Sequence, residues 1–435
     1  MVAGTKTLKP VHPVLARAQT RRDVLLCTPS HDRQERDMRQ GWILAAALLC
    51  AASLSAQRTL IVDAKGGSGV YTKFAPAVAA ARDGDRILIR AGNYYGTTIS
   101  KALDIRAHPG VVLSPNLSGF SRLRVTGIGK GKTLVLDGPT IKGALFGSAL
   151  HPGVDVANCQ GRVLIRNVRV DVSSALFNSA PPASIQVRNC AAVSVERATL
   201  IGPLVAFTST VSVASASIQG TDSTGKFGPY TSFASQGVSA SSSRLDLANV
   251  VLRGGNGHSA FAVSAMEALG AINSHIVIRG DSSRVTAGSK GPKTVAAMYG
   301  GKTTTLRIDP DVVVVGKVSD FKRTTRVQMG AMRTTDAKLG KMLQVDLLAP
   351  KGQFYDFFLS LPGRPVTHGP WGDFWLDWNT LIPISLGFVP PAGVVSLKLT
   401  VPNNPNLRYL NLAFQGKTGP WPNLFYTNPV SVTVR

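Results

Sequence analysis

The sequence is short of acidic residues, cysteine and aromatic residues. Its 435 residues include 24 Asp and Glu, four Cys and 7% aromatic residues. So few cysteines exclude a disulfide-dense scaffold, and we predict no metal site and no other cofactor. So few carboxylates disfavour a polysaccharide hydrolase, because that chemistry needs paired acids on one face of the protein.

The shortage of acids is matched by an excess of bases. The formal net charge is +24, and it is +20 without residues 1–56, which hold eight basic and four acidic residues. Such a chain attracts polyanions, namely acidic polysaccharide, a cell-envelope glycan or lipid, or nucleic acid. No nucleic-acid-binding motif is present, so we expect no nucleic-acid partner. The alternative is that the excess of basic residues reflects a basic proteome or serves general solubility.

Long hydrophobic runs are also absent, except for one from Gly41 to Ala52. This run follows Met38-Arg39-Gln40 and precedes small residues, an order typical of a secretory signal. We therefore expect residues 1–37 to be an upstream extension that is not native or is disordered, residues 38–56 to be a signal peptide, and the protein to be secreted or displayed at the cell surface. A run this short does not span a membrane.

What the sequence has is a hydrophobic repeat, Φ-x-Φ-x-x-Φ-x-Φ-x-G, where Φ is mostly apolar. Rows of this kind begin at Leu134, Val193, Val211, Leu245 and, more loosely, Ala271. A row at Val163 has the same pattern without the glycine. Each row predicts two short strands around a two-residue bend, and strands this short must stack on their neighbours to bury an apolar face.

The bends and the upstream residues extend this prediction to a coil of three strands. The second bend position holds residues that include glycine and asparagine, which adopt a left-handed backbone most easily; in row order they are Gly138, Asn167, Arg197, Ser215, Asn249 and His275. A third strand is predicted upstream of the rows, with inward pairs Val154 and Val156, Ile185 and Val187, and Phe261 and Val263. The chain is therefore predicted to be all-β, with a parallel β-solenoid over residues 57–318.

Two coils share the spelling Val-x-Asn-Cys, ending at Cys159 and Cys190. With the repeat, this pattern resembles the right-handed parallel β-helix of the pectin-lyase-like superfamily. The block from Thr59 to Tyr95 resembles the amino-terminal cap of pectinesterase-like members. Stacking predicts that Cys159 and Cys190 lie inward on adjacent coils, as a disulfide or as a pair of stacked thiols.

The repeat stops before residues 319–435, where seven short strand signals alternate with proline and glycine loops. This region is predicted to be a small antiparallel β-sandwich, and it resembles a C-terminal module of large secreted bacterial proteins. The strands are expected at Met342–Leu348, Tyr355–Leu361, Phe374–Trp378, Ile384–Val389, Val394–Val401, Tyr409–Gln415 and Val430–Val434.

Two functions remain open from these residues. The resemblance allows a polysaccharide lyase acting on uronate chains, with Arg188, Asp155 and Arg166 as candidate catalytic residues. The bend residues Asp137, Arg166 and Glu196 alternate in sign, however, which favours an exposed ladder of ion pairs over catalysis. The family usually places its site on the third strand, where this chain has small outward residues such as Ala157, Ala262 and Ser264.

We favour a monomeric protein that binds acidic polysaccharide or a cell-envelope glycan without clear catalysis. Arginines at outward positions of the coils and tryptophans of the sandwich are the candidate ligand-binding residues, since guanidinium groups pair with carboxylates and aromatic rings stack on sugars. These candidates are Arg162, Arg166, Arg169, Arg188, Trp371 and Trp375.

Overall fold

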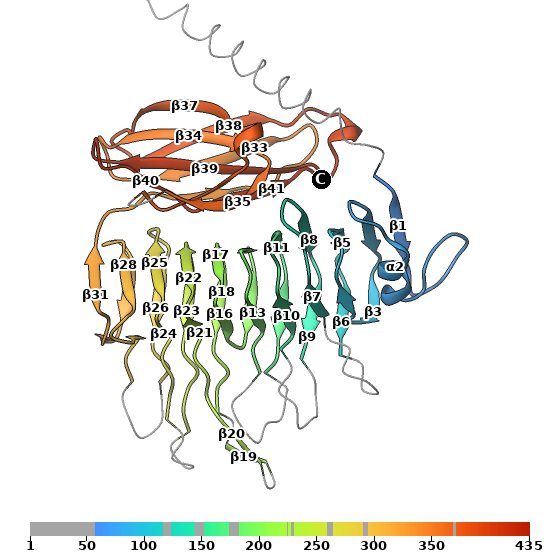
Figure 1. Cartoon of the computed structure of the whole chain (residues 1–435), viewed down its shortest axis with the longest axis horizontal. Helices are drawn as coiled ribbons and strands as arrows, with labels where there is room; N and C mark the ends of the chain where they lie inside the picture. The colour runs from blue at the N-terminus through green and yellow to red at the C-terminus, as the bar shows by residue number, and fades with distance from the viewer. Residues whose placement is uncertain are drawn as a thin grey trace, which may run out of the picture. The chain divides into compact units, whose positions relative to one another are not determined.

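The protein is a right-handed parallel β-helix followed by a small antiparallel β-sandwich (Figure 1). The computed structural model describes residues 57–115, 123–143, 152–173, 182–223, 225–227, 230–258, 264–289, 295–368 and 371–435. The signal peptide expected at residues 38–56 and the strand expected around Phe261 and Val263 lie outside these ranges. No helix among the described residues is long and apolar enough to cross a membrane.

Each complete coil of the β-helix runs through one strand of sheet C, then sheet A, then sheet B. Sheet A contains β1 (Thr59–Val62), β2 (Arg86–Ile89), β5 (Asp104–Ala107), β8 (Thr133–Asp137), β11 (Arg162–Arg166), β14 (Ala192–Glu196), β17 (Thr210–Ala214), β22 (Arg244–Ala248), β25 (His275–Arg279), β28 (Thr305–Ile308) and β31 (Arg323–Arg326). Parallel pairing therefore continues beyond residue 318, through β31.

The other two sheets complete the coils. Sheet B contains β3 (Gly92–Tyr95), β6 (Val111–Ser114), β9 (Thr140–Lys142), β12 (Arg169–Asp171), β15 (Thr199–Ile201), β18 (Ser217–Gln219), β23 (Val251–Arg253), β26 (Arg284–Thr286) and β29 (Val313–Val315). Sheet C contains β4 (Thr98–Ile99), β7 (Leu123–Thr126), β10 (Val154–Ala157), β13 (Ile185–Arg188), β16 (Leu204–Phe207), β21 (Val238–Ser241), β24 (Leu269–Ile272), β27 (Met298–Gly300) and β30 (Val318–Ser319).

The rows of the repeat are pairs of strands from sheets A and B. Val193 and Val195 lie on β14, Leu200 lies on β15, and all three are buried in one continuous core. At the bends, Asn167, Arg197, Ser215, Asn249 and Gly138 have positive φ, as predicted. The row at Ala271 was placed one strand too early, because Ala271 belongs to β24 of sheet C and His275 begins β25 rather than forming a bend.

A short cap closes the first coil, as expected from the sequence. Strand β1 leads through a glycine turn to helix α2 (Phe74–Ala80), which buries Phe74, Ala77 and Val78 against the end of the β-helix core before β2 begins. Covering this end protects an apolar core and an unpaired sheet edge from other chains.

The thiols of Cys159 and Cys190 are both buried at successive turns and are free. Cys190 Sγ lies 3.7 Å from the carbonyl oxygen of Val156, on the preceding coil. Of the two outcomes expected for this pair, the structure has the stacked thiols and not the disulfide.

The sandwich has two sheets. Sandwich sheet 1 contains β32 (Ala331–Thr334), β33 (Met342–Leu348) and β38 (Val394–Thr400), and sandwich sheet 2 contains β37 (Ile382–Phe388), β34 (Phe354–Ser360), β39 (Asn411–Gly419), β40 (Phe425–Tyr426) and β41 (Val430–Thr433). A hairpin of β35 (Pro362–Thr367) and β36 (Asp373–Leu376) packs on sheet 2. The seven expected strands are found, whereas β32, β35 and β40 were not predicted; the glycine and prolines of β35 hide its strand character.

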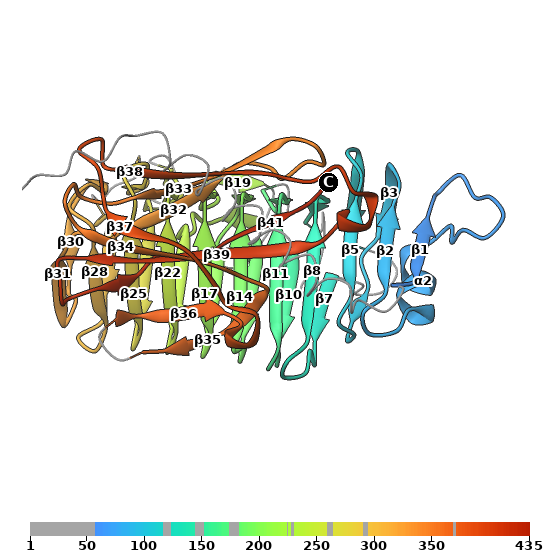
Figure 2. The same ribbon diagram turned by 90° about the horizontal axis from the view of Figure 1, so that it is seen from above.

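The sandwich packs on the outer face of sheet A (Figure 2). Strand β39 contacts β11 through Asn411 and Arg166, and strand β41 contacts β14 through Ser431 and Glu196. Both of these hydrogen bonds between described sandwich strands and the β-helix reach sheet A.

Candidate functional site

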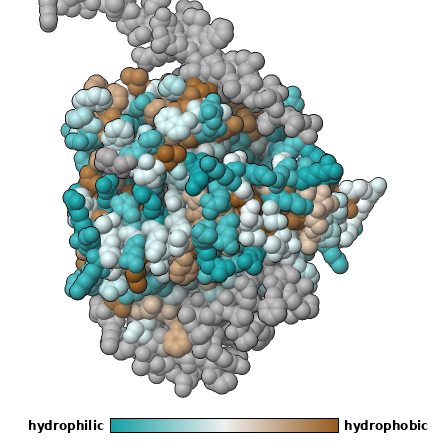
Figure 3. Space-filling model, in the orientation of Figure 1, coloured by the Kyte–Doolittle hydropathy of each residue, from teal (hydrophilic) through white to brown (hydrophobic). Residues whose placement is uncertain are grey.

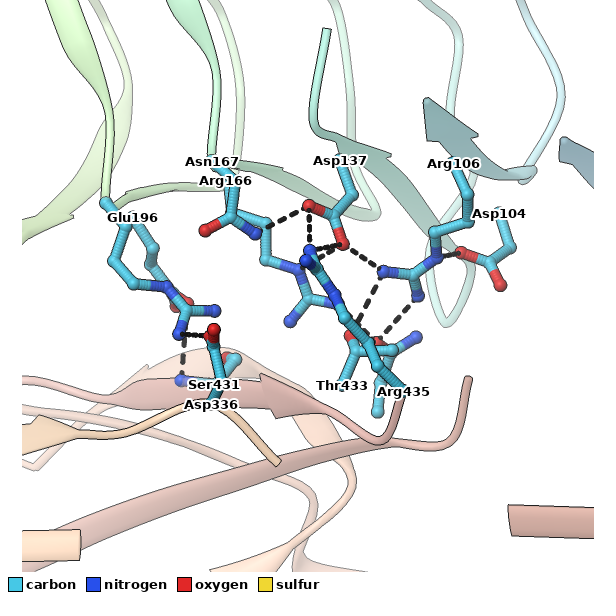
Figure 4. A network of polar contacts seen from close by, with 12 residues as sticks. Asp104, Arg106, Asp137, Arg166, Asn167, Glu196, Asp336, Ser431, Thr433 and Arg435 are labelled. Carbon is cyan, nitrogen blue, oxygen red and sulfur yellow. Dashed lines mark hydrogen bonds and ion pairs between the residues drawn. The ribbon is translucent and has the colours of Figure 1, made fainter. Parts of the chain in front are cut away.

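The contact between sheet A and the sandwich is a buried ionic network (Figure 4). At its centre Asp137 accepts hydrogen bonds from Arg106 at 2.6 Å, from Asn167 at 2.6 Å and from Arg435 at 2.9 and 3.0 Å. Arg166 lies 3.4 Å from the same carboxylate. Burial alone would raise the pKa of Asp137, but the surrounding arginines outweigh it and lower that pKa to about 2.

The predicted exposed ladder of ion pairs is therefore wrong in one respect. Asp137, Arg166 and Glu196 do stack on successive coils, but their exposed fractions are 2%, 0% and 4% because the sandwich covers them. Burial raises the pKa of Glu196, whose carboxylate accepts a hydrogen bond from the backbone of Ser431 at 3.3 Å. A buried ladder ties the two domains together and is not a surface feature.

Two of the arginines predicted to bind ligand are excluded for the same reason. Arg162 is 2% exposed, donates to Ser194 and Ser431 at 3.3 Å, and lies with its guanidinium carbon 6.0 Å from the centre of the Trp375 ring. Burial lowers the pKa of Arg162, and of the equally covered Arg166, to about 10. Trp375 is itself 0% exposed, so it packs the interior and does not stack on a sugar.

The candidate catalytic pair Asp155 and Arg188 does come together, on the outer face of sheet C. Arg188 donates to both carboxylate oxygens of Asp155 at 2.9 and 3.0 Å, and Arg124 lies 3.5 Å from the same group. This two-oxygen contact fixes the guanidinium on a carboxylate of the protein itself. Asp155 is 1% exposed and out of reach of a ligand, whereas the side chain of Arg188 is 44% exposed.

A small cavity at the seam between sheet A and the sandwich gathers further titratable groups. It encloses about 30 Å³ and is lined in part by Asp246, Asp373, Arg244 and His275. Burial, with the nearby Asp373, raises the pKa of Asp246, and burial together with Arg244 lowers that of His275 to about 4. Each carboxylate is held by an arginine, and the volume fits only a few waters, so no sugar binds there.

An open groove of about 480 Å³ follows the corner between sheets A and B. Its floor includes Thr199, Ser217 and Val251, outward residues that pair in register on β15, β18 and β23. The bend residues Ser215, Asn249 and Ser282 form one wall, and Arg197 and the sandwich residue Arg333 complete it. This volume lies in the range of ligand sites, and the described residues that line it include no carboxylate.

Arginines lie beyond both ends of the groove floor. The strand register places Arg169 of β12 beside Thr199, and Arg284 of β26 beside Val251. Both arginines are exposed. Four coil steps separate them, or about 19 Å at about 4.8 Å a step. Arg169 is therefore a predicted ligand-binding residue that the structure leaves accessible.

Sequence reasoning did not name Arg284, Thr199, Ser217 or Arg333. The first three could have been found, because they occupy the same outward column as Arg169 once the rows are aligned. Arg333 could not, since it reaches the groove from the sandwich. Among the described residues no group of His, Cys, Asp and Glu is arranged to hold a metal ion.

No family model matches the chain, and no curated protein matches it. Among solved structures, it is similar to the enzymatically active domain of tailspike protein 2 of bacteriophage CBA120. The identity is 10% and the TM-score 0.30, over 87% of this chain and 76% of that one. Similarity at this level does not bear on function, and the fold assignment rests on the three parallel sheets themselves.

Proposed function

We propose that the protein is exported and binds acidic polysaccharide, without cleaving it, in the groove along sheet B. The observation that carries this proposal is the groove lining, in which hydroxyls, an amide and two arginines are present. Arg197 and Arg333 each contact an aspartate that is outside this lining, Asp336 at 2.8 Å and Asp346 at 3.1 Å, so a uronate carboxylate would share or replace these partners. Arginine pairs with uronate carboxylates, and hydroxyls and amides bond sugar hydroxyls. Arg169 and Arg284 extend the positive charge along the chain of sugars.

The alternative is a uronate lyase, which uses a base and cations that neutralise the substrate carboxylate. Its candidate base Arg188 is bound to Asp155, and its other candidate Arg166 is covered by the sandwich. Among the described residues, the groove lining includes arginines but no carboxylate or histidine that could accept a proton from the substrate. These contacts favour binding over cleavage.

The proposal is tested by affinity electrophoresis in gels containing polygalacturonate, alginate or uncharged dextran, at low and high salt. The unsubstituted protein is expected to be retarded by the two acidic polymers at low salt only, since salt screens exposed charges. The double variant Arg169→Gln and Arg284→Gln is expected to bind roughly tenfold more weakly, from the loss of two exposed ion pairs.

The matched control is the double variant Lys398→Gln and Arg408→Gln, which removes the same charge from exposed positions of the sandwich. Equal weakening in the control would mean that net charge, and not the groove, governs binding. If the ultraviolet absorbance of an unsaturated uronate product grows with time, the protein is a lyase and the proposal of binding without cleavage is wrong.

A further inference from the structure

Exposed aromatic residues gather on one face of the sandwich, although aromatic residues are only 7% of the chain. Trp421 is 74% exposed and Phe388 71%, and the neighbouring Leu386 is 70% exposed. Trp371 and Trp378 are 42% and 52% exposed. Tryptophan is normally largely buried, so three exposed tryptophans in one small domain require an explanation beyond folding.

The first part of this cluster lies on the side of sandwich sheet 2 that also carries Asn411 against the β-helix, at a part of that side where Phe388 and Trp421 stay exposed. Phe354 pairs across the strands with Phe388, and the rings meet edge to face at 5.9 Å and 82°. Phe354 meets Trp421 in the same way at 5.7 Å and 70°. Edge-to-face packing holds Phe388 and Trp421 in place, while their high exposure leaves ring surface open to solvent.

A pair of opposite charges comes next on the same face. Asp356, two residues beyond Phe354, lies opposite Lys417 in the pairing of β34 with β39. Both side chains are half-buried. The ammonium of Lys417 lies 4.2 Å from the centre of the Trp371 ring, which links the charged pair to the next exposed tryptophan.

The last part surrounds Phe374 of the β35–β36 hairpin. Trp378 packs on Phe374 with ring centres 4.4 Å apart, and His368 meets Trp378 at 5.6 Å. Tyr426 joins this part to Lys417, whose ammonium is 5.5 Å from the Tyr426 ring. We call Trp421, Phe354, Phe388, Asp356, Lys417, Trp371 and Trp378 together the aromatic strip. Figure 3 shows hydrophobic and hydrophilic residues side by side on the visible face of the sandwich, at the top of the view.

We propose that the aromatic strip binds an uncharged polysaccharide chain. The exposed rings stack on the apolar faces of sugar rings, while Asp356 accepts hydrogen bonds from sugar hydroxyls and Lys417 donates to them. An apolar protein partner or a lipid surface would instead bury this charged pair without replacing its water, which is costly. One acid and one base leave the strip without net charge, which fits an uncharged ligand.

This site is independent of the sheet B groove in both residues and chemistry. The groove depends on arginines and responds to salt, whereas stacking on the strip is expected to persist at high salt. A protein with both sites would link an acidic and an uncharged glycan, and each site would raise the effective concentration of the other ligand.

The test uses the full protein in native gels that contain soluble β-glucan, xylan or galactomannan, at high salt. At least one of these polymers is expected to retard the protein. The same polymer is expected to protect the tryptophan fluorescence from quenching by acrylamide. Trp421→Ala and Trp371→Ala are each expected to weaken binding roughly tenfold, because a stacking ring is lost. Tyr95→Ala removes an equally exposed ring, 59% exposed, from sheet B and is expected to bind normally.

Several outcomes would overturn the proposal. In the first, none of the three polymers retards the protein. In the second, both tryptophan variants unfold at the same temperature as the unsubstituted protein and are still retarded to the same extent. Concentration-dependent self-association abolished by Phe388→Ser would assign the strip to a second copy of this chain. Sedimentation with phosphatidylcholine vesicles abolished by Trp421→Ala would assign it to a membrane. The double variant Arg169→Gln and Arg284→Gln is expected to bind the uncharged polymers normally. The test of the aromatic strip is therefore separate from the test of the groove.

Discussion

At the residue scale, Asp137 joins the β-helix to the sandwich. Its carboxylate is 2% exposed and is contacted by Arg106, Arg166 and Arg435. Removing one partner of a buried ionic group leaves the others desolvated and unpaired. We expect Asp137→Asn to lower the free energy of unfolding at neutral pH by about 3 kcal/mol, measured by denaturant titration. Asp336→Asn breaks a largely exposed pair with Arg197 and is expected to cost less than about 1 kcal/mol.

The pH dependence of this variant has a definite sign. The pKa of Asp137 is about 2 in the folded protein, below its ordinary value of 3.8, so the folded state releases this proton more readily. The resulting contribution of about 2 kcal/mol is complete above about pH 4 and is lost as the pH falls through 2. The difference in stability between the unsubstituted protein and Asp137→Asn should shrink over that interval. A difference that stays constant would show that the charge of Asp137 is not the cause.

At the scale of the element, the glycines that end two of the rows, Gly220 and Gly254, are required by close packing at the base of a long loop. A Cβ atom on Gly254 would lie 1.9 Å from the carbonyl oxygen of Met266, on the returning leg of the same loop. On Gly220 a Cβ atom would lie 2.0 Å from the carbonyl oxygen of Ser235. The two legs hydrogen-bond at this point, as when Met266 donates to Gly255 at 3.0 Å. The repeat thus records backbone contact as well as apolar burial.

We expect Gly254→Ala to destabilise the protein by about 2 kcal/mol, because backbone atoms must move to admit the methyl group. Gly129→Ala is the matched control, since its nearest neighbour would be the Lys132 side chain at 3.8 Å and its φ is not in the left-handed region. Its effect should stay within about 0.5 kcal/mol. Thermal unfolding of both variants decides the point, and equal losses would contradict the close approach.

At the scale of the whole molecule, the sandwich divides the surface of the β-helix by covering sheet A. The sandwich covers three arginines that would otherwise belong to the basic surface. They are 2%, 0% and 5% exposed, for Arg162, Arg166 and Arg279 in that order. Accessible arginines remain on sheet B, beside the groove. The net charge therefore counts arginines that a polyanion cannot contact. The sheet on which an arginine lies decides whether it can bind a polyanion.

Export is a prediction about the whole chain and depends on residues 38–56. If these residues are a signal peptide, the mature protein starts near Gln57, directly before the first described strand β1. Mass spectrometry of protein secreted by an expressing bacterial host is expected to find an amino terminus near Gln57. Peptides from residues 1–37 in the secreted material would contradict this expectation.

The sequence alone determined the β-helix, because period-two strands and left-handed bends are local features. The bend residues Asn167, Arg197, Ser215 and Asn249 each show the expected backbone, and β33 spans the predicted Met342–Leu348. The one misplaced row is predicted to begin at Ala271. This apolar residue belongs to sheet C, but its spacing from the next apolar residues fits the first position of a row. Local pattern fixes which side of a strand faces the core, and it therefore found the coils.

Only the tertiary structure decided which outward faces meet solvent. In a coil taken by itself, Arg162 and Arg169 are equivalent outward residues, yet one is buried under the sandwich and the other lies beside the groove. A partial signal existed, because the outward column of sheet A holds Val135, Leu164, Ser194 and Ser212, which are apolar or small and are all buried. The docking of β39 and β41 on this column joins segments more than 200 residues apart in sequence, such as Arg166 with Asn411. Period and propensity are set by near neighbours in the chain, so they do not contain that contact.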